Sequence, residues 1–203
     1  MKTFACGLLL GVFSLAWAEE PVVSVPEGAR LQADNLFPRV EMVTSLGRMV
    51  VELNRHRAPI TVNNFLRYVA AGHYDGSVFH RVEPGFVVQG GGYDARYQPL
   101  KTAAPIFNES GNGLRNAALT IAMARYGDPH SATDQFYFNL DDNDSLDPGR
   151  RWGYAVFGEL VDGEGVLEKI AGVKTGYHEG LDAEHVPLQP VRILKVRLLP
   201  EEP

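Results

Sequence analysis

Cysteine and positive charge are both scarce in this chain. Its 203 residues include one cysteine, Cys6, which cannot form a disulfide within the chain. The 19 Lys and Arg are outnumbered by 25 Asp and Glu, so the formal net charge is -6. Because nucleic-acid binding requires a concentrated positive surface, this balance argues against a nucleic-acid partner.

The common signatures of metal, phosphate and hydrolase sites are also absent from the sequence. The six histidines are scattered, without an H-x-x-x-H pair, and no G-x-S-x-G elbow occurs. Residues 90–92 are three glycines without a following G-K-[ST], so we interpret them as tight backbone curvature after a strand. The acidic run that begins at Asp141 has Leu146 and Trp152 where a calcium loop requires Gly and Glu. We therefore expect no metal and no cofactor.

Long hydrophobic runs are missing except at the N-terminus. There, a basic start at Lys2 precedes an apolar run from Phe4 to Leu15 and an A-x-A cleavage pattern at residues 16–18. These are the three parts of a secretory signal peptide, and the run is too short to cross roughly 30 Å of hydrocarbon as an anchor. We expect cleavage after residue 18, a periplasmic location and no membrane contact afterwards. An export signal alone does not separate the periplasm from secretion.

The remainder of the chain is predicted to form one domain with a short leader. Residues 19–38 are polar, contain three prolines and show no sustained periodicity, which indicates a flexible or loosely docked segment. Residues 39–200 are the predicted domain, in accord with roughly 150 residues per domain. Whether the leader packs on this domain is left open by the sequence.

Short β-like segments dominate the predicted domain. A hairpin with a turn at Leu46-Gly47 comes first, and a helix follows Pro59, with Thr61 as its expected cap and Gly72 as its stop. A second short helix is predicted over residues 166–170, and the other expected strands are residues 78–82, 86–89, 119–124, 135–140, 154–160 and 191–199. Many short strands with two isolated helices favour an antiparallel barrel or sandwich capped by helices.

One segment carries a highly specific resemblance to a known family. Residues 79–91 read FHRVEPGFVVQGG, which resembles the FHRxxPGFxxQGG signature of cyclophilins, the peptidyl-prolyl cis-trans isomerases. Residues 121–125, 131–138 and 154–158 resemble three further family segments in the same order. With the signal peptide, the chain is most similar to the bacterial periplasmic cyclophilins. The resemblance implies a mainly β fold, a closed eight-stranded antiparallel barrel capped by two α-helices.

The resemblance also implies a function and a site. The function is acceleration of X-Pro bond rotation in exported proteins, with a proline-segment-binding chaperone module as the alternative. The implied catalytic residues are Arg81 and Gln89, and those implied to bind substrate are Phe86, Val87, Ala124, Arg125, Gln135, Tyr137, Leu146 and Tyr154. The expected partners are unfolded or partly folded proline-containing polypeptides, and the protein is expected to be a monomer.

One departure from the family pattern concerns a drug site. Ser145 occupies the place where eukaryotic members commonly carry a tryptophan that packs on cyclosporin. We therefore expect weak cyclosporin binding.

The reaction itself explains why an arginine suits the site. When an amide twists, the nitrogen lone pair loses its delocalisation and becomes a hydrogen-bond acceptor. A fixed cationic donor such as Arg81 therefore favours the twisted state over both planar isomers. His80, which strict alternation turns away from Arg81, is interpreted as structural. Alternation also separates Gln135 and Tyr137 from Phe136 and Phe138, without showing which face is the site.

Overall fold

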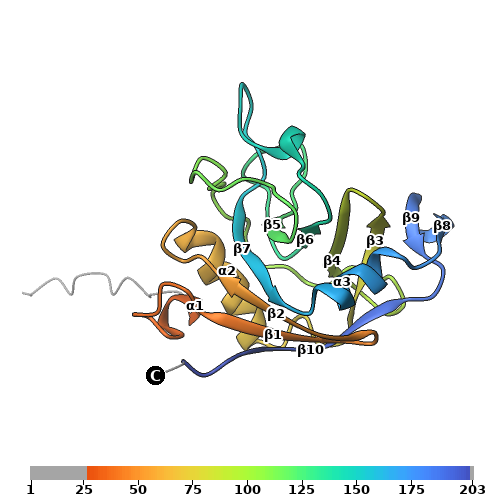
Figure 1. Ribbon diagram of the computed structural model, residues 1–203, viewed down its shortest axis with the longest axis horizontal. Coiled ribbons are helices and arrows are strands. Elements are labelled where there is room, and N and C mark those ends of the chain that lie inside the picture. Colours follow the sequence, from red (N-terminus) through yellow and green to blue (C-terminus); the bar gives the residue numbers. More distant parts are fainter. Residues whose placement is uncertain (1–26, 202–203) are drawn as a thin grey trace, which may run out of the picture.

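Eight antiparallel strands close into a barrel. The computed structural model describes residues 27–201, so the predicted signal peptide lies outside the described residues. The strands follow the order β1-β10-β3-β4-β6-β5-β7-β2 around the barrel (Figure 1). Their bounds are β1 Arg39–Thr44, β2 Gly47–Leu53, β3 Ser77–Glu83, β4 Val87–Asp94, β5 Thr120–Met123, β6 Phe136–Asn139, β7 Val156–Asp162 and β10 Val191–Leu198. The predicted eight-stranded barrel is confirmed. Within residues 27–201, no helix is long and apolar enough to cross a membrane.

The first hairpin shows how alternation builds the barrel wall. Met49, Val51 and Leu53 are fully buried, whereas Val50 is 5% exposed and Glu52 is half-buried. The turn is one residue earlier than expected, because Gly47 already pairs with Thr44. The Thr44 hydroxyl accepts from the Leu46 N–H at 3.1 Å and donates to the Gly47 carbonyl at 2.8 Å, which fixes the turn at Ser45-Leu46.

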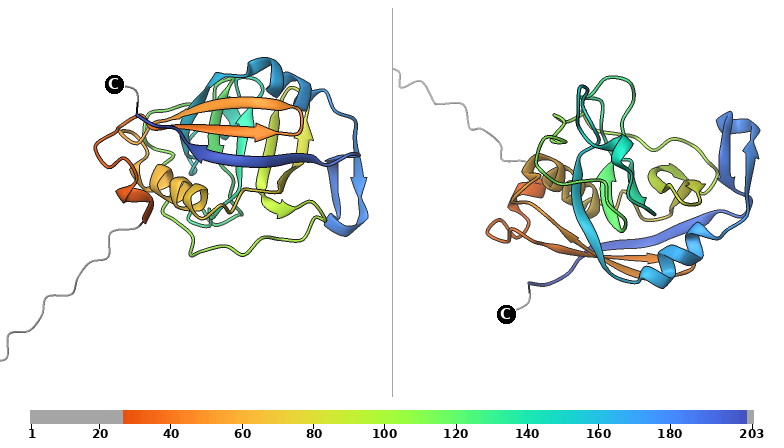
Figure 2. Two further views of the ribbon diagram at one scale, coloured as in Figure 1. Left: turned by 90° about the horizontal axis from the view of Figure 1, so that it is seen from below. Right: turned by 45° about the horizontal axis from the view of Figure 1, so that its top comes forward.

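Two helices close the ends of the barrel (Figure 2). Helix α2, Pro59–Ala70, buries Phe65 against the rings of Phe136 and Phe157, with ring centroids 5.6 and 5.3 Å away. Helix α3, Glu164–Ala171, buries Leu167 and Ile170 and contains the predicted helical residues 166–170. The barrel interior is therefore filled by side chains and holds the main hydrophobic core.

The start of α2 differs from the prediction. Its N-cap is Ala58, and Pro59 occupies the first turn, where a missing N–H costs nothing. Thr61 is therefore not the cap. The open N–H groups of Ile60 and Thr61 instead donate to the Glu109 carboxylate at 3.1 and 2.7 Å. A distant carboxylate thus supplies the cap that the local sequence lacks.

The glycine run at residues 90–92 lies inside β4 rather than after a strand. Its glycines make room for neighbouring side chains. A Cβ at Gly90 would stand 2.7 Å from the Phe79 ring, and one at Gly91, whose φ is +90°, would stand 2.9 Å from Phe136. The backbone of β4 therefore lies so close to the aromatic core that only glycine fits at positions 90 and 91.

The described part of the leader is packed on the barrel. Helix α1, Glu27–Arg30, contacts α2, and Gly28 is pressed so closely on Asn63 that a Cβ would lie 1.8 Å from its carbonyl oxygen. The buried guanidinium of Arg55 donates to the carbonyls of Gly28, Leu31, Gln32 and Asn35. Residues 27–38 therefore pack on the barrel, a point that the sequence left open, because one arginine donates to four of their backbone oxygens.

A second hairpin outside the barrel was not predicted. Strands β8, Thr175–His178, and β9, Ala183–Pro187, pair with each other alone. Their side chains are mostly exposed or half-buried, so no apolar alternation marks them in the sequence. The His178 ring packs on Tyr97 at 4.5 Å between centroids, which ties the hairpin to the loop after β4.

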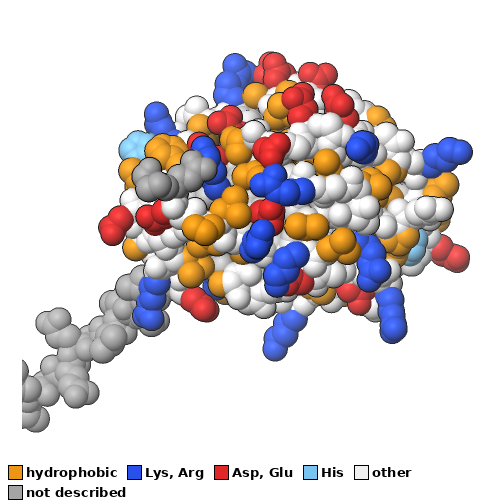
Figure 3. Space-filling view, turned by 60° about the horizontal axis from the view of Figure 1, so that its bottom comes forward, with side chains coloured by type: hydrophobic (Ala, Val, Ile, Leu, Met, Phe, Trp, Pro, Cys, Tyr) orange, Lys and Arg blue, Asp and Glu red, His pale blue; other side chains and the backbone are white. Residues whose placement is uncertain are grey.

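The face of the barrel formed by β1, β2 and β10 carries charges of both signs (Figure 3). Glu41 on β1 is contacted by Arg48 and Arg197, with N–O distances of 2.5 and 2.6 Å. Hydrogen bonds from Arg197 and Arg48 hold the pKa of the Glu41 carboxyl below its usual range. Basic side chains on this face are thus interspersed with acidic ones rather than gathered in a patch.

Candidate active site

An irregularity in the pairing of β3 with β4 decides where Arg81 points. Phe79 pairs with Gly90 and Arg81 with Gln89, so β3 contains one extra residue, His80. Without this β-bulge, Arg81 would share the inward face of Phe79. With it, Val82 is fully buried in the barrel core and the Arg81 side chain is 36% exposed. The bulge therefore re-aims the arginine to the outside of the barrel.

His80, the extra residue, is nearly buried. Its ring lies 4.7 Å from that of Tyr93, and its Nδ1 has no hydrogen-bond partner within the described residues. Burial, together with the charge of Arg81, lowers the pKa of His80 to about 4. His80 is therefore neutral at neutral pH. Strict alternation, from which we expected it to point away from Arg81, does not apply across a bulge.

The guanidinium of Arg81 is held by two neighbours. Its Nη2 donates to the Glu83 carboxylate, and its Cζ lies 5.5 Å from the centre of the Phe86 ring. Gln89, which the resemblance implies to be catalytic, donates through Nε2 to Gln135 Oε1 at 2.9 Å. From the sequence alone, Glu83 was not identified as the partner of Arg81. Residues two apart on a strand share a face, so the opposite charge at Glu83 could have indicated this ion pair.

An apolar cluster separate from the barrel core lies beside Arg81. Six of the eight residues predicted to bind substrate belong to it, and three further members were not predicted: Ala122, Val156 and Leu114. The six are Phe86, Val87, Ala124, Tyr137, Leu146 and Tyr154. Phe136 and Phe138 belong to the barrel core instead. The structure therefore identifies the outer face of β4, β5 and β6 as the one that carries this cluster.

Tyr137 forms the polar floor of the cluster. It is 4% exposed, and its hydroxyl donates to Asn116 Oδ1 at 2.8 Å. Asn116 is held in turn by Asp147, whose Oδ1 accepts from the Asn116 N–H at 2.7 Å. Burial raises the pKa of Tyr137 well above its usual value, so the phenol stays protonated. Asn116 is the polar neighbour that this hydroxyl needs, and the sequence alone did not identify it.

The two remaining predicted residues, Arg125 and Gln135, lie at one side of the cluster. The Arg125 guanidinium stacks over the Tyr154 ring, with Cζ 4.5 Å from its centre. Gln135 and Gln89 line a small hollow of about 60 Å³ together with Ala124, Arg125, Tyr126, Ser131 and Thr133. The ten predicted site residues are therefore brought together on one outer face, which we call the groove.

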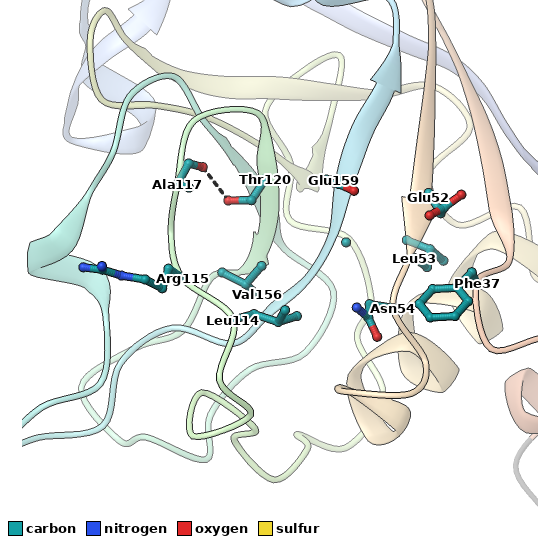
Figure 4. Close-up of a pocket in the computed structure, with 11 residues that line it drawn as sticks. Phe37, Glu52, Leu53, Asn54, Leu114, Arg115, Ala117, Thr120, Val156 and Glu159 are labelled. Atoms are coloured by element: carbon teal, nitrogen blue, oxygen red, sulfur yellow. Dashed lines mark hydrogen bonds between the residues drawn. The ribbon is translucent and has the colours of Figure 1, made fainter.

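A larger hollow, of about 300 Å³, lies next to the groove (Figure 4). It separates the end of β2 from the segment that leads into β5, and Phe37 of the leader borders it. It shares Leu114 and Val156 with the apolar cluster but contains none of the ten predicted residues. Cavity size alone therefore does not identify the site. Among residues 27–201, no group of three or more His, Cys, Asp or Glu is placed to hold a metal ion.

Comparisons with known proteins identify the family of the chain. The family model for the cyclophilin type peptidyl-prolyl cis-trans isomerase/CLD matches residues 39–198. The chain is 52% identical over 164 residues to peptidyl-prolyl cis-trans isomerase cyp18 of Streptomyces antibioticus, covering 79% of this chain and 98% of that protein. It is 44% identical to peptidyl-prolyl cis-trans isomerase B of Escherichia coli, covering 74% of this chain and 96% of the other.

A solved structure shows the same fold. A cyclophilin type isomerase of Cryptosporidium parvum superposes with a TM-score of 0.67 at 23% identity, covering 82% of this chain and 99% of that one. A second structure of that protein was determined in the presence of the dipeptide Ala-Pro. The family match covers every strand of the barrel and all ten residues of the groove. The chain therefore belongs to the cyclophilin-type peptidyl-prolyl cis-trans isomerases and has their isomerase activity.

Proposed function

We propose that the groove binds an X-Pro segment of an unfolded polypeptide and that Arg81 stabilises its twisted amide. Rotation about a peptide bond has a barrier of roughly 18–20 kcal/mol, and uncatalysed X-Pro exchange takes tens to hundreds of seconds. In the twisted state the prolyl nitrogen regains its lone pair and accepts a hydrogen bond. A donor that meets this nitrogen only in the twisted state lowers the barrier rather than merely binding substrate.

The observation that carries the proposal is the position of Arg81 at the edge of an apolar cluster on the outer wall. The proline ring would pack on Phe86 and Leu146, which are apolar and partly accessible from outside, above the buried ring of Tyr137. Arg81 adjoins Phe86, so a proline ring that packs on Phe86 would bring the prolyl nitrogen close to the Arg81 guanidinium. The Gln89–Gln135 pair offers an amide donor and acceptor for the substrate backbone. In the groove, the apolar cluster would therefore anchor the proline ring, and Arg81 would stabilise the lone pair on the prolyl nitrogen.

Arg81 supplies only part of the acceleration. One hydrogen bond from a charged donor contributes about 1.5–3 kcal/mol, which corresponds to roughly 10- to 100-fold in rate. The rest comes from holding the proline ring while the chain on one side of the bond rotates. Substitution of the arginine should therefore weaken catalysis without abolishing peptide binding.

The test is NMR exchange on a short Ala-Pro peptide with the chain from Glu19 onward. We expect Arg81→Ala to lower kcat/KM by roughly 10- to 100-fold, mostly through kcat. Arg192→Ala, which removes an exposed arginine from β10, is the matched control and should leave exchange unchanged. Equal exchange by wild type and Arg81→Ala would remove Arg81 from this role.

We further propose that the protein is exported and assists folding in the periplasm as a monomer. The support is the N-terminal pattern at residues 1–18 and the absence of cysteine after it. Expression of the full chain in Escherichia coli should give a periplasmic protein whose first residue is Glu19 and whose mass in solution is that of one chain. Ala16→Leu should block the processing. A cytoplasmic protein that begins at Met1 would contradict the proposal.

A further inference from the structure

Three loops beside the groove each contribute one ring to an exposed aromatic cluster. The Phe107 ring stacks on His130 at 4.5 Å between centroids, with 17° between the ring planes. Trp152 meets both rings edge-on, at 5.7 Å from Phe107 and 5.0 Å from His130. Phe107 is 54% exposed and Trp152 44% exposed. We call Phe107, His130 and Trp152 the aromatic platform.

The loops that carry the platform are tied together by one buried side chain. Asn108 is 4% exposed, and its Nδ2 donates to the carbonyls of Pro129 and Gly153 at 3.1 and 3.0 Å. Its own N–H donates to His130 Nδ1 at 3.2 Å. These bonds join Asn108, the residue after Phe107, to the His130 ring and to the residues next to His130 and Trp152. The rings are therefore held in place without being buried, so little ordering cost remains for a ligand that packs on them.

The platform is also joined to the groove. Arg125, which stacks on Tyr154 of the apolar cluster, donates to the carbonyl of Trp152 at 2.7 Å and to that of Gly153 at 3.2 Å. It also donates to the carbonyl of Tyr126, a 72% exposed residue that lines the small hollow beside Gln89. Arg125 thus links Tyr154 of the groove to Trp152 of the platform, so that the two surfaces are continuous.

We propose that the aromatic platform is an additional subsite for the client polypeptide, and that it binds an aromatic or large aliphatic side chain a few residues from the proline. This inference rests on the proposed function of the groove, because it assigns the same chain to both surfaces. An extended chain advances about 3.3 Å per residue, so a few residues beyond the proline are enough to leave the groove. Rigid aromatic rings exposed next to a binding site are the residues that most often anchor a partner side chain.

The occupant follows from the continuity of the surface. A polypeptide that lies in the groove must leave it along one of its sides, and on the side of Arg125 and Trp152 it meets exposed rings. The side chain that binds there should be large and apolar. The stacked rings present broad apolar faces to it rather than hydrogen-bonding groups. Unfolded chains expose such side chains, whereas folded proteins bury them. The platform therefore favours unfolded clients over folded proteins with an exposed proline.

Peptides that differ at one position test this inference. The reference peptide carries Ala-Pro with Ala and Ser on both sides, and two others carry Phe three residues before or three residues after the proline. We expect wild type to show a KM about three- to tenfold lower for at least one Phe peptide. Phe107→Ala and Trp152→Ala should each bring the ratio of the two KM values towards one. Trp152→Phe should retain the preference.

The control is Tyr177→Ala, which removes a 56% exposed ring on β8, outside the platform, and should retain the wild-type ratio. The absence of any preference in wild type would overturn the inference. A preference that survives both Phe107→Ala and Trp152→Ala would overturn it too, and this comparison does not depend on the stability of a single variant.

Fluorescence separates this inference from the proposed function. The chain contains two tryptophans, Trp17 and Trp152, so the form that begins at Glu19 holds Trp152 alone. Titration with a Phe peptide should change the emission of Trp152, whereas the reference peptide should change it little. If wild type failed to accelerate exchange but still showed this difference, the proposed role of the groove would fail and the platform would stand. Equal emission changes with both peptides would overturn the platform.

Discussion

Arg81 and Glu83 are bonded to each other on the outer face of β3, through Arg81 Nη2 and a Glu83 carboxylate oxygen. Both side chains are about one-third exposed, with 36% and 32% of their surface accessible. The pair holds one edge of the guanidinium, and in the proposed mechanism its other N–H groups would meet the substrate. Glu83 is therefore a positioning residue for Arg81 rather than a group that meets the proline.

Removal of that carboxylate should reduce turnover. Exposed ion pairs contribute about 0–1 kcal/mol, so Glu83→Ala is expected to lower kcat by up to about fivefold. Glu83→Gln, which keeps a hydrogen-bond acceptor, should restore most of the rate. In the Arg81→Ala background, Glu83→Ala should have no further effect on kcat. A full additional loss in that background would show that Glu83 acts independently of Arg81.

Tyr137→Phe should weaken the fold more than the chemistry. The change removes the hydroxyl that donates to Asn116 and leaves the ring in the groove. Asn116 Oδ1 still accepts from Asn139 Nδ2 at 3.3 Å, so the free energy of unfolding should fall by only about 0.5–1.5 kcal/mol. Urea denaturation measures this difference. Tyr177→Phe, at an exposed hydroxyl, is the control, and an equal loss there would contradict the assignment.

His80 should make the protein less stable in weak acid. The pKa of His80 is about 4 in the folded protein and about 6.5 when unfolded, so below pH 6.5 the unfolded state binds more protons. Stability linked to this residue is complete above pH 6.5, falls between pH 6.5 and 4, and is lost below pH 4. This difference between the two pKa values of His80 corresponds to about 3 kcal/mol in the free energy of unfolding.

The comparison with a non-titrating variant isolates this effect from the other ionisable groups. Urea denaturation of wild type and His80→Phe at pH 7 and pH 4.5 should show a smaller acid-induced loss in the variant. Parallel losses in the two proteins would show that the pKa of His80 changes little on folding.

Arg55→Ala should detach the leader. Loss of the guanidinium removes a donor from four carbonyls of residues 28–35, and within the described residues only that of Gln32 keeps another, the Asn35 N–H. A carbonyl that loses its hydrogen bond away from water is costly. We expect the free energy of unfolding to fall by about 2–4 kcal/mol and protease cleavage to begin between residues 27 and 38. Arg57→Ala, at an exposed position two residues away, should change neither measurement. Protection of this segment in Arg55→Ala would contradict the role of Arg55.

Ser145 offers a test of drug binding. It lies in η1, a short 3-10 helix over Asp144–Leu146, next to the groove residue Leu146. Without a large ring at this position, cyclosporin loses an apolar contact, so we expect weak binding to wild type. Ser145→Trp should tighten it by about 10-fold or more, the value of one buried aromatic contact. Calorimetric titration with cyclosporin measures both affinities, and submicromolar affinity for wild type would contradict the expectation.

Local patterns predicted much of the fold, and the misses have physical causes. Alternation along β6 correctly separated Tyr137 from Phe136 and Phe138, because neighbouring side chains of a strand point to opposite faces of the sheet. Thr61 was wrongly chosen as a cap because the true acceptor, Glu109, is 48 residues away. The β8–β9 hairpin escaped notice since its exposed side chains need no apolar pattern.

In the site too, features set by neighbouring residues were predictable, whereas contacts between distant segments were not. A family motif and alternation brought together the ten residues that lie on the groove. The bulge at His80 could not be read from the sequence, because it depends on which residue of β4 each residue of β3 meets. Nor could the partnership of Tyr137 with Asn116, which joins two segments 21 residues apart.

Two separate apolar clusters share the same strands. Val88 and Phe136 point into the barrel core, whereas their neighbours Val87 and Tyr137 belong to the outer cluster. Residues of the outer cluster can therefore change without opening a cavity in the core. A lineage of such proteins can alter which clients it prefers while the packing inside the barrel stays constant, since the two clusters lie on opposite sides of one wall.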